Sequence, residues 1–275
     1  MLYKERLPML KRYIFLVLFF FIICTSVNVF AVPVAYRSWT YLDLTALLSP
    51  EWSWTLLSSH SYEFDRNNDP KSDVEKKTFF YEVFTGPTYT MKFGNLTVKL
   101  PLWYYYQGFP IRSAVNPSDH DKYFYSHNIE FMPTLEYKIG NFKFWNRVIF
   151  HNKVYSSLYD SSSKNKGYSL LIREYFRVEY NVTDQFAVMI GDEIFQGIIE
   201  DDDTKDITPS PVSPGFEYGG FTQNRLYIGF SYKFTPTIII TPMYMYQTQY
   251  FDAGNELTEK DHYLFTTLTF IFKTY

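Results

Sequence analysis

The sequence predicts an all-β fold, an antiparallel up-and-down transmembrane β-barrel of roughly 10–12 strands with short periplasmic turns and longer extracellular loops. Aromatic residues make up 21% of the 275 residues, yet the mean hydropathy is only −0.21. Aromatic and polar residues must therefore alternate along the chain rather than separate into long apolar blocks. The alternating spans, at roughly 12–16 residues, are long enough for a tilted crossing of a bilayer, and their connections are alternately short and long.

The chain begins with the features of a secretory signal peptide. Four basic residues precede the apolar run IFLVLFFFII at 14–23, and the triplet VFA, which ends at Ala31, suits a cleavage site. We therefore expect a signal peptide at 1–31 and an outer-membrane β-barrel at 32–275. Cleavage after Ala35 is the second choice, and an uncleaved membrane anchor is the alternative.

Cysteine and charge exclude several function classes. Cys24 is the only cysteine and lies within the expected signal peptide, so the exported chain would have neither a disulfide nor a thiolate site. Loss of the signal peptide would remove four of 26 basic residues and one of 29 acidic residues, which makes the exported chain more acidic than the full chain. An acidic chain without a basic cluster argues against nucleic acid as a partner.

A repeated phrase marks two hairpins. PTYTMKFGN at 87–95 and PTLEYKIGN at 133–141 both end in Gly-Asn, a glycine-first loop that is typical of a type II′ turn. In the second copy, the pair Ile139·Phe142 places apolar residues together on one face. The same register pairs Thr134 with Arg147 and Glu130 with His151 on the opposite face. A slip of one residue would mix the faces, so the register is well specified.

The first copy gives the same pattern. Pairing of Phe93 with Leu96 sets Trp103 opposite Gly86, where an aromatic ring can cover a bare glycine. Turn signals at 48–52, 180–184 and 233–237 mark further short reversals. The expected strands, in chain order, are 51–64, 78–93, 95–107, 124–139, 141–156, 168–181, 184–199, 221–234, 237–251 and 261–273, and the expected long loops are 65–77, 108–123, 157–167, 200–220 and 252–260.

The strand count depends on the segment 37–48. Without it, ten strands give an even number with both ends in the periplasm. With it, there are eleven, which breaks this parity unless a twelfth strand is hidden or the segment is a plug. Ten and twelve strands both remain open.

Several residues resist the simple pattern. Pro87, Pro133 and Pro242 fall inside strands, and because proline cannot donate to a ladder we expect local bulges there. Glu174 and Asp192 fall on the outer face by strict alternation, so we expect them near the lipid headgroups or beside a bulge.

The outward face indicates the surroundings of the barrel. It carries many Tyr and Phe residues, which favour the membrane–water boundary, whereas the core of a soluble periplasmic sandwich would be mostly aliphatic. A sheet in hydrocarbon must close on itself because no backbone group may stay unpaired. We expect the bacterial cell outer membrane as location, with its lipid and lipopolysaccharide as partners; no protein partner or oligomeric state can be named.

One stretch resembles a known family. FTQNRLYIGFSYKFTPTIIITPMYMYQ at 221–247 is similar to the late hairpin of small bacterial outer-membrane proteins catalogued as the domain of unknown function 2490. Its Gln-Asn-Arg-aromatic phrase is matched by Gln223, Asn224, Arg225 and Tyr227. IREYFRVEY, DEIF and RSWTYLDLTALLSPEWSWTL also resemble parts of that family. The chain departs from it at the C-terminus, where KTY follows Phe272. The resemblance implies a fold and a location but lends no activity.

The inward face holds the candidate functional residues. By alternation it includes Glu82, Lys99, Glu130, Glu136, Arg147, His151, Arg173, Arg177, Glu179, Glu193, Arg225 and Lys233. In a narrow barrel, interleaved arginine and glutamate residues can bond across the interior and fill it. The alternative is a polar pore with a charge ring, and since both signs are present no ion preference follows.

Three functions are compared. The first is a small channel for polar solutes, the second a non-conducting structural or surface-interaction barrel, and the third an outer-membrane lipid hydrolase. The strings HSYEF at 60–64, SHN at 126–128 and HNKVYSS at 151–157 are the only hints of hydrolase chemistry. Neighbours along a strand point to opposite faces, so His127 should face lipid, away from Ser126. We therefore expect no enzyme and no cofactor.

An acidic run, EDDDTKD at 200–206, lies in a long loop. Crowded carboxylates can hold Ca²⁺ or bridge through divalent ions to lipopolysaccharide phosphates. The spacing does not fit an EF-hand loop, and a solvated charged loop is the favoured interpretation, so no metal site is expected.

Overall fold

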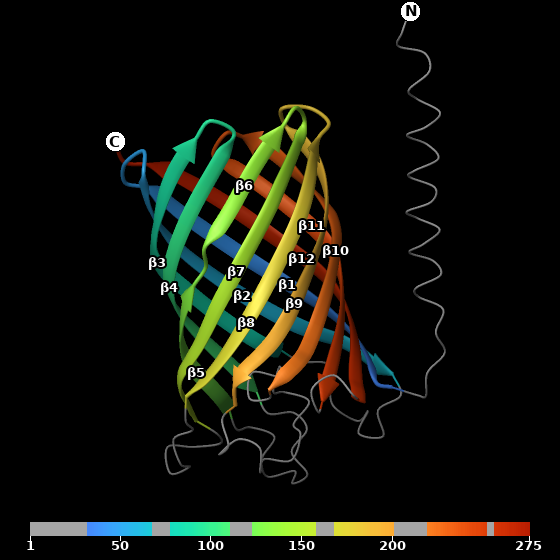
Figure 1. Cartoon of the computed structure of the whole chain (residues 1–275). Coiled ribbons are helices and arrows are strands. Elements are labelled where there is room, and N and C mark those ends of the chain that lie inside the picture. Colours follow the sequence, from blue (N-terminus) through green and yellow to red (C-terminus); the bar gives the residue numbers. More distant parts are fainter. Residues whose placement is uncertain (1–31, 68–77, 111–122, 158–167, 201–218, 252–255) are drawn as a thin grey trace, which may run out of the picture. The chain divides into compact units, whose positions relative to one another are not determined.

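A computed structural model describes residues 32–67, 78–110, 123–157, 168–200, 219–251 and 256–275, whose regular elements are all β-strands (Figure 1). The expected signal peptide 1–31 lies outside these residues. The strands are β1 (Val34–Leu47), β2 (Trp52–Asn67), β3 (Thr78–Phe93), β4 (Leu96–Pro110), β5 (Tyr123–Phe131), β6 (Thr134–Ile139), β7 (Phe142–Ser157), β8 (Ser169–Asn181), β9 (Phe186–Ile199), β10 (Gly220–Thr235), β11 (Ile238–Phe251) and β12 (Glu256–Lys273). Each strand expected from the sequence has a counterpart, but the expected strand 124–139 is interrupted and forms both β5 and β6.

The strands close into a single barrel. β5 and β6 are separated only by Met132 and Pro133, and both pair with β4 on one side and β7 on the other. They therefore occupy one position in the barrel between β4 and β7. We call each such position a stave, so the twelve strands of the sheet make eleven staves. Each stave is hydrogen-bonded to two neighbours, so among the described residues the sheet has no free edge.

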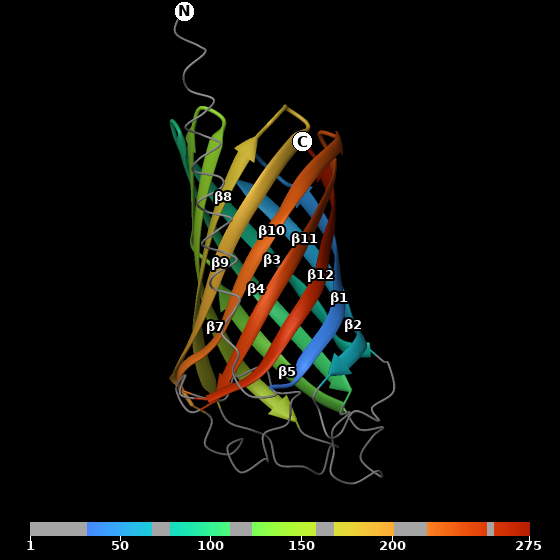
Figure 2. The ribbon, with the colours of Figure 1, turned by 90° about the vertical axis from the view of Figure 1, so that its right-hand side faces the viewer.

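The barrel closes through a parallel pair. β1 and β12 run in the same direction, from Val34 opposite Lys260 to Leu47 opposite Lys273, and lie side by side in Figure 2. All other described pairs are antiparallel. The expectation of an even strand number, ten or twelve, with both ends on one side is therefore wrong. The segment 37–48 is not a plug, because it forms most of β1, the strand that closes the barrel against β12. An odd number of antiparallel staves can close only if one pair is parallel.

The short turns gather at one end of the barrel. In Figure 1 the connections at 48–51, 94–95, 140–141, 182–185 and 236–237 all lie at the upper end, where β12 also finishes. Gly94 and Gly140 have φ values of 58° and 56°, as a glycine-first turn requires. We call this the short-turn end and the opposite end the loop end.

The hairpin registers read from the repeated phrase are confirmed. Ile139 pairs with Phe142 and Thr134 with Arg147, and in the first copy Phe93 pairs with Leu96. A Cβ atom at Gly86 would lie 2.7 Å from Trp103 Cδ1, so the indole does cover this glycine.

The expected proline bulges are wrong. The register is the same on both sides of Pro87, Pro133 and Pro242, although pairing is interrupted beside them. Proline has no backbone N–H to donate, but its backbone carbonyl can still accept. Val148 N donates to Pro133 O at 3.1 Å. The neighbouring pairs then hold the register. Shifts occur elsewhere, mostly toward the loop end, for example between Tyr36 and Arg37.

Glu174 and Asp192 lie on the outer face as expected, but neither is beside a register shift. Each is satisfied by an asparagine of a neighbouring strand instead. Asn146 Nδ2 donates to Glu174 at 2.9 Å, and Asn224 Nδ2 donates to Asp192 at 2.6 Å.

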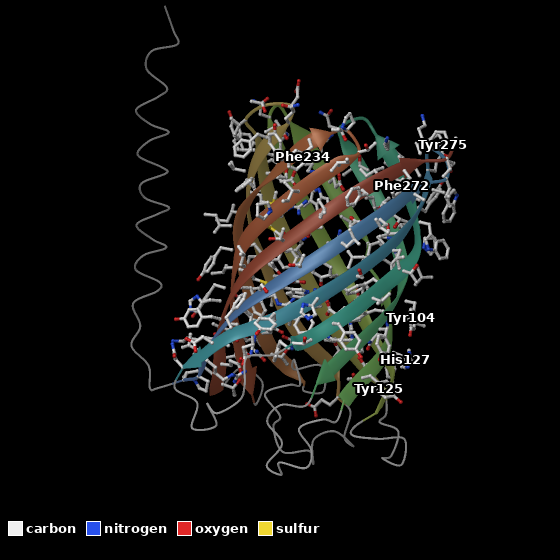
Figure 3. The ribbon with its side chains drawn as sticks, turned by 180° about the vertical axis from the view of Figure 1, so that it is seen from behind. Tyr104, Tyr125, His127, Phe234, Phe272 and Tyr275 are labelled. Carbon is white, nitrogen blue, oxygen red and sulfur yellow. The ribbon has the colours of Figure 1, made fainter. Side chains whose placement is uncertain are left out.

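The rest of the outer face is largely apolar, and rings gather toward both ends (Figure 3). Phe234, Phe272 and Tyr275 lie at the short-turn end, and the Tyr104 hydroxyl contacts His127 Nδ1 at 2.6 Å toward the loop end. Between them the strands expose aliphatic residues such as Ile228. In the described part of the chain, no helix is long and apolar enough to cross a membrane.

The parallel closure can be tested by cross-linking. Thr40 and Thr266 face each other across β1 and β12, so Thr40→Cys with Thr266→Cys in a Cys24→Ser background should form a disulfide under mild oxidation. The matched control is Thr40→Cys with Phe270→Cys, which the parallel register keeps apart. The measurement is the mobility of the denatured chain on a non-reducing gel. Equal cross-linking of both pairs would refute the register.

Candidate functional site

Strand alternation sends the sequence-predicted charged residues into the barrel. The candidates Glu130, Glu136, Arg147, His151, Arg173, Arg177, Glu179 and Arg225 are all buried or half-buried. Lys233, by contrast, lies exposed at the short-turn rim, where its Nζ donates to the carbonyl of Asp184 at 3.3 Å.

A charged cluster lies inside the barrel toward the loop end. Arg37 donates to Glu63 at 2.7 Å, to Glu259 at 2.6 Å and to Asp261 at 2.8 Å. Arg66 bonds Glu63 and Glu259, each at 3.2 Å. We call these five residues the Arg37 cluster. They come from β1, β2 and β12, so the cluster spans the parallel closure.

Arg37 is among the most deeply buried side chains of the described structure. Its guanidinium lies 3.6 Å from the centre of the Phe79 ring and donates to the Tyr263 hydroxyl at 2.9 Å. A buried charge is tolerated only when its bonds are satisfied, and here three carboxylates surround one guanidinium. The cluster therefore holds β1, β2 and β12 together from within.

The Arg37 cluster was missed by the sequence analysis. The expected spans stopped at residue 64 and began again at 261, which left Arg66 and Glu259 in loops. The register shift between Tyr36 and Arg37 also hides the pairing with Glu63. The available signal was the alternation of Glu259 with Asp261 at the start of the last strand.

A second buried centre forms around Glu82. Its carboxylate accepts from the Tyr41 hydroxyl at 2.8 Å, from Ser59 at 2.6 Å, from Tyr105 at 2.5 Å and from Gln107 Nε2 at 3.0 Å. Four donors from β1, β2 and β4 thus converge on one carboxylate of β3. Together with the Arg37 cluster, this centre packs the interior on one side of the barrel.

The opposite wall is bridged by Arg173. Its guanidinium binds Glu193 at 2.7 Å and Glu130 at 3.4 Å. Glu130 also contacts His151 Nδ1 at 2.6 Å, which confirms the pair expected from the hairpin register. The Tyr227 hydroxyl donates to Glu193 at 2.6 Å, so this network reaches from β5 to β10.

A cationic group surrounds Trp145 nearer the short-turn end. The guanidinium carbons of Arg177 and Arg147 lie 3.9 and 5.2 Å from the centre of the indole. We call these three residues the Trp145 cluster. The ammonium groups of Lys99 and Lys143 lie at 5.5 and 5.2 Å. The two carboxylates here are already paired, Glu136 with Lys99 at 2.5 Å and Glu179 with Lys143 at 2.8 Å.

A cavity of about 370 Å³ lies between these groups. One wall is aromatic: Trp39 meets Phe80 edge-on at 4.9 Å, and Phe84 stacks on Tyr105 at 4.1 Å. The other wall carries guanidinium groups. The charged residues that line the cavity are Asp43, Glu82, Glu130, Arg147, Arg173, Arg177, Glu193 and Arg225.

The two ends of the interior differ in exposure. Toward the loop end, inward residues are buried, and examples are Ser61, Asn128, Lys153 and Gln223. Toward the short-turn end, inward residues are half-buried, and examples are Thr45, Lys99, Lys143 and Thr269. Solvent therefore reaches the interior from the short-turn end, while the loop end is packed.

A comparison with known protein families gives a match over most of the chain. A model of proteins of unknown function, DUF2490, matches residues 36–258. The chain belongs to the DUF2490 family. No curated protein matches this chain.

The motif positions of this DUF2490 barrel divide between its two faces. Arg225 and Tyr227 line the cavity, and Arg225 Nε donates to Gln247 at 2.7 Å. Gln223 is buried beside Gln247. Asn224 points outward to Asp192. The phrase therefore contributes to the cavity wall through alternate residues only.

The histidines do not assemble a catalytic group in the described DUF2490 structure. His127 lies on the outer face, whereas Ser126 and Asn128 are buried inside, as alternation requires. His60 contacts Thr78 at 2.9 Å. Both ring nitrogens of His151 are engaged, one by Glu130 and the other by Asn128 at 3.1 Å.

Metal chemistry finds no support in the described residues, among which no cluster of three or more His, Cys, Asp or Glu side chains could hold an ion. For the acidic run at 200–206, the sequence analysis favoured a solvated charged loop over a calcium site. Apart from Glu200, which accepts from Gly219 N at 2.9 Å, it lies outside the described residues.

Loss of Arg37 should strongly destabilise the barrel. Arg37→Ala leaves three buried carboxylates without their shared partner, and breaking such a buried set costs about 3–5 kcal/mol. The measurement is urea unfolding followed by the folded and unfolded bands of unboiled gel samples. Lys233→Ala, at the exposed rim, is the control and should change stability little. Equal stability of both variants would contradict the role of the cluster.

Proposed function

We propose that this protein is an integral outer-membrane β-barrel that does not conduct, and whose interior is a blind pocket open toward the periplasm. It is an elaboration of the non-conducting alternative expected from the sequence. The observation that carries it is the packed loop end, where the Arg37 cluster and the Glu82 centre fill the interior, in contrast to the half-exposed short-turn end.

The outer face supports insertion in a membrane. A closed sheet leaves no unpaired edge for hydrocarbon to meet, and the exposed side chains between the two ends are largely apolar. Tyrosine and histidine pairs lie toward the loop end: Tyr104 contacts His127 at 2.6 Å and Tyr244 contacts His262 at 2.5 Å. Such rings, dry on one side and polar at the tip, suit the headgroup level. Lipid and lipopolysaccharide are then the surrounding partners.

The orientation follows from the connections. Bacterial barrels place short turns in the periplasm and long loops outside. The short-turn end would then face the periplasm, and the pocket would exchange its contents with that compartment. An enzyme is not part of this proposal, in which His151 is a structural residue held by Glu130 and Asn128.

The second candidate is the small channel for polar solutes. The cavity favours it, because open space lined in part by charged residues already occupies part of the interior. Conduction would require the Arg37 cluster to separate, which means exposing buried ion pairs to water on every opening. The closed geometry therefore ranks the channel below the blind pocket.

Conductance in planar bilayers separates the two candidates. The purified, folded wild-type protein should give no steps above baseline, because the loop end of its interior is packed. A large general porin, reconstituted in the same way, is the positive control. Reproducible opening events in the wild-type protein, in proportion to the amount inserted, would favour the channel and overturn the blind pocket.

Membrane insertion can be tested on a single outward residue. Ile228 lies in the middle of β10 among Ile190 and Tyr244 and is 51% exposed. If lipid covers this face, Ile228→Arg should destabilise the barrel in lipid vesicles by about 2–4 kcal/mol. The control is Asn95→Arg, at the tip of a turn. An Ile228→Arg variant that is as stable as the control would argue against a lipid-covered face.

A further inference from the structure

The cavity has more hydrogen-bond donors than its own residues satisfy. Trp39 Nε1, Trp145 Nε1 and Arg177 Nε are buried, line the cavity, and have no hydrogen-bond partner among the described residues. A buried donor without a partner costs about 1–3 kcal/mol. One lining acceptor, Gln107 Oε1, is also unpartnered. The excess of donors indicates that the cavity is built to receive an acceptor.

Arg147 adds a charge to this excess. Its Nε donates to Thr134 Oγ1 at 3.1 Å, and no carboxylate of the described residues pairs with it. The other lining arginines have acidic partners: Arg173 and Arg225 face Glu193, and Arg177 binds Glu179 at 2.5 Å. The lining guanidinium without an acidic partner among the described residues is therefore that of Arg147, a member of the Trp145 cluster.

The surroundings of the Trp145 cluster strengthen its positive field. Four cationic groups lie within 5.5 Å of the indole centre, and among the described residues they form ion pairs with two carboxylates, Glu136 and Glu179. Inward residues at this level are half-buried, so an anion from solvent could reach the cluster. A guanidinium presents two parallel donors, which fit the two oxygens of a carboxylate.

The rest of the cavity is apolar on one side. Trp39, Phe80 and Phe265 form edge-on contacts, and the Phe84–Tyr105 stack continues the surface. A simple inorganic anion would leave this aromatic wall exposed to water. A volume of about 370 Å³ falls within the range of small-molecule sites.

These observations define a ligand class, and the inference rests on the blind pocket proposed above. We propose that the cavity binds an organic carboxylate with an apolar body, which enters from the short-turn end. Its carboxylate binds Arg147, Arg177 and the Trp145 indole N–H, and its apolar body packs along Trp39 and Phe84. Binding would satisfy donors that the protein leaves open.

The test uses dodecanoate and its uncharged counterpart dodecanol. Each is titrated calorimetrically into the full barrel in zwitterionic-lipid nanodiscs, with the heat from empty discs subtracted. Dodecanoate should bind saturably at one site, at least tenfold more tightly than dodecanol. Arg147→Gln should weaken dodecanoate about tenfold to a hundredfold, the usual effect of one bond to a charged group. Lys233→Gln, a rim cation that does not line the cavity, should leave binding unchanged.

A second variant guards against misfolding. Trp145→Phe removes the indole N–H and shortens the ring but keeps an aromatic face, and it should weaken dodecanoate several-fold, while dodecanol binding changes little. Unboiled gel mobility reports folding of each variant. Equal affinity for both probes, or an equal loss in the Lys233→Gln control, overturns the carboxylate site. Absence of saturable binding by either probe means that the cavity holds water only, and also overturns it. Conductance is measured on the same preparations, so failure of the blind pocket is seen separately.

Discussion

The whole structure depends on the closure of one hydrogen-bonded sheet through the parallel pair β1–β12. Without that pair, two strands would present unpaired backbone groups, which the membrane proposed above could not satisfy. Closure also determines which side chains face the enclosed interior and which face the outside. With eleven staves the interior is narrow, so inward polar groups cannot keep a full shell of water and must find each other. Arg37, at the seam itself, shows the result: its partners Glu63, Glu259 and Asp261 come from both neighbouring strands.

The inward polar groups are satisfied to different degrees at the two ends of the interior. Toward the loop end, charges are paired or multiply hydrogen-bonded, and Glu82 is held by four uncharged donors. Toward the short-turn end, donors stay open and cations outnumber acids around Trp145. Satisfied networks rigidify, whereas an unsatisfied one is stable only if solvent or a ligand completes it. The packing of the loop end and the openness of the cavity are thus two outcomes of the same narrow geometry.

Alternation was enough to predict most of the fold, because a period of two fixes which residues share a face. The pairs Ile139·Phe142 and Glu130·His151 follow from one turn and one hydrophobic pattern. The closing pair could not be found this way, since no turn links β1 to β12. Contacts across the seam or through bulges were also beyond reach, as between Arg37 and Glu63. The family resemblance is confirmed over 36–258, yet it could not indicate which residues enclose the cavity.

The wall formed by β7 to β10 departs from the simple pattern on both faces. Inside it carries the four arginines of the cavity, and outside it carries Glu174 and Asp192 on a face that is otherwise largely apolar. Arg173 and Glu174 are consecutive, so opposite charges point to opposite faces of one strand. A sheet is a single peptide layer thick, and in a medium of low dielectric such charges attract across it. The outward acids, hydrogen-bonded to Asn146 and Asn224, therefore oppose part of the positive potential that the inward arginines create.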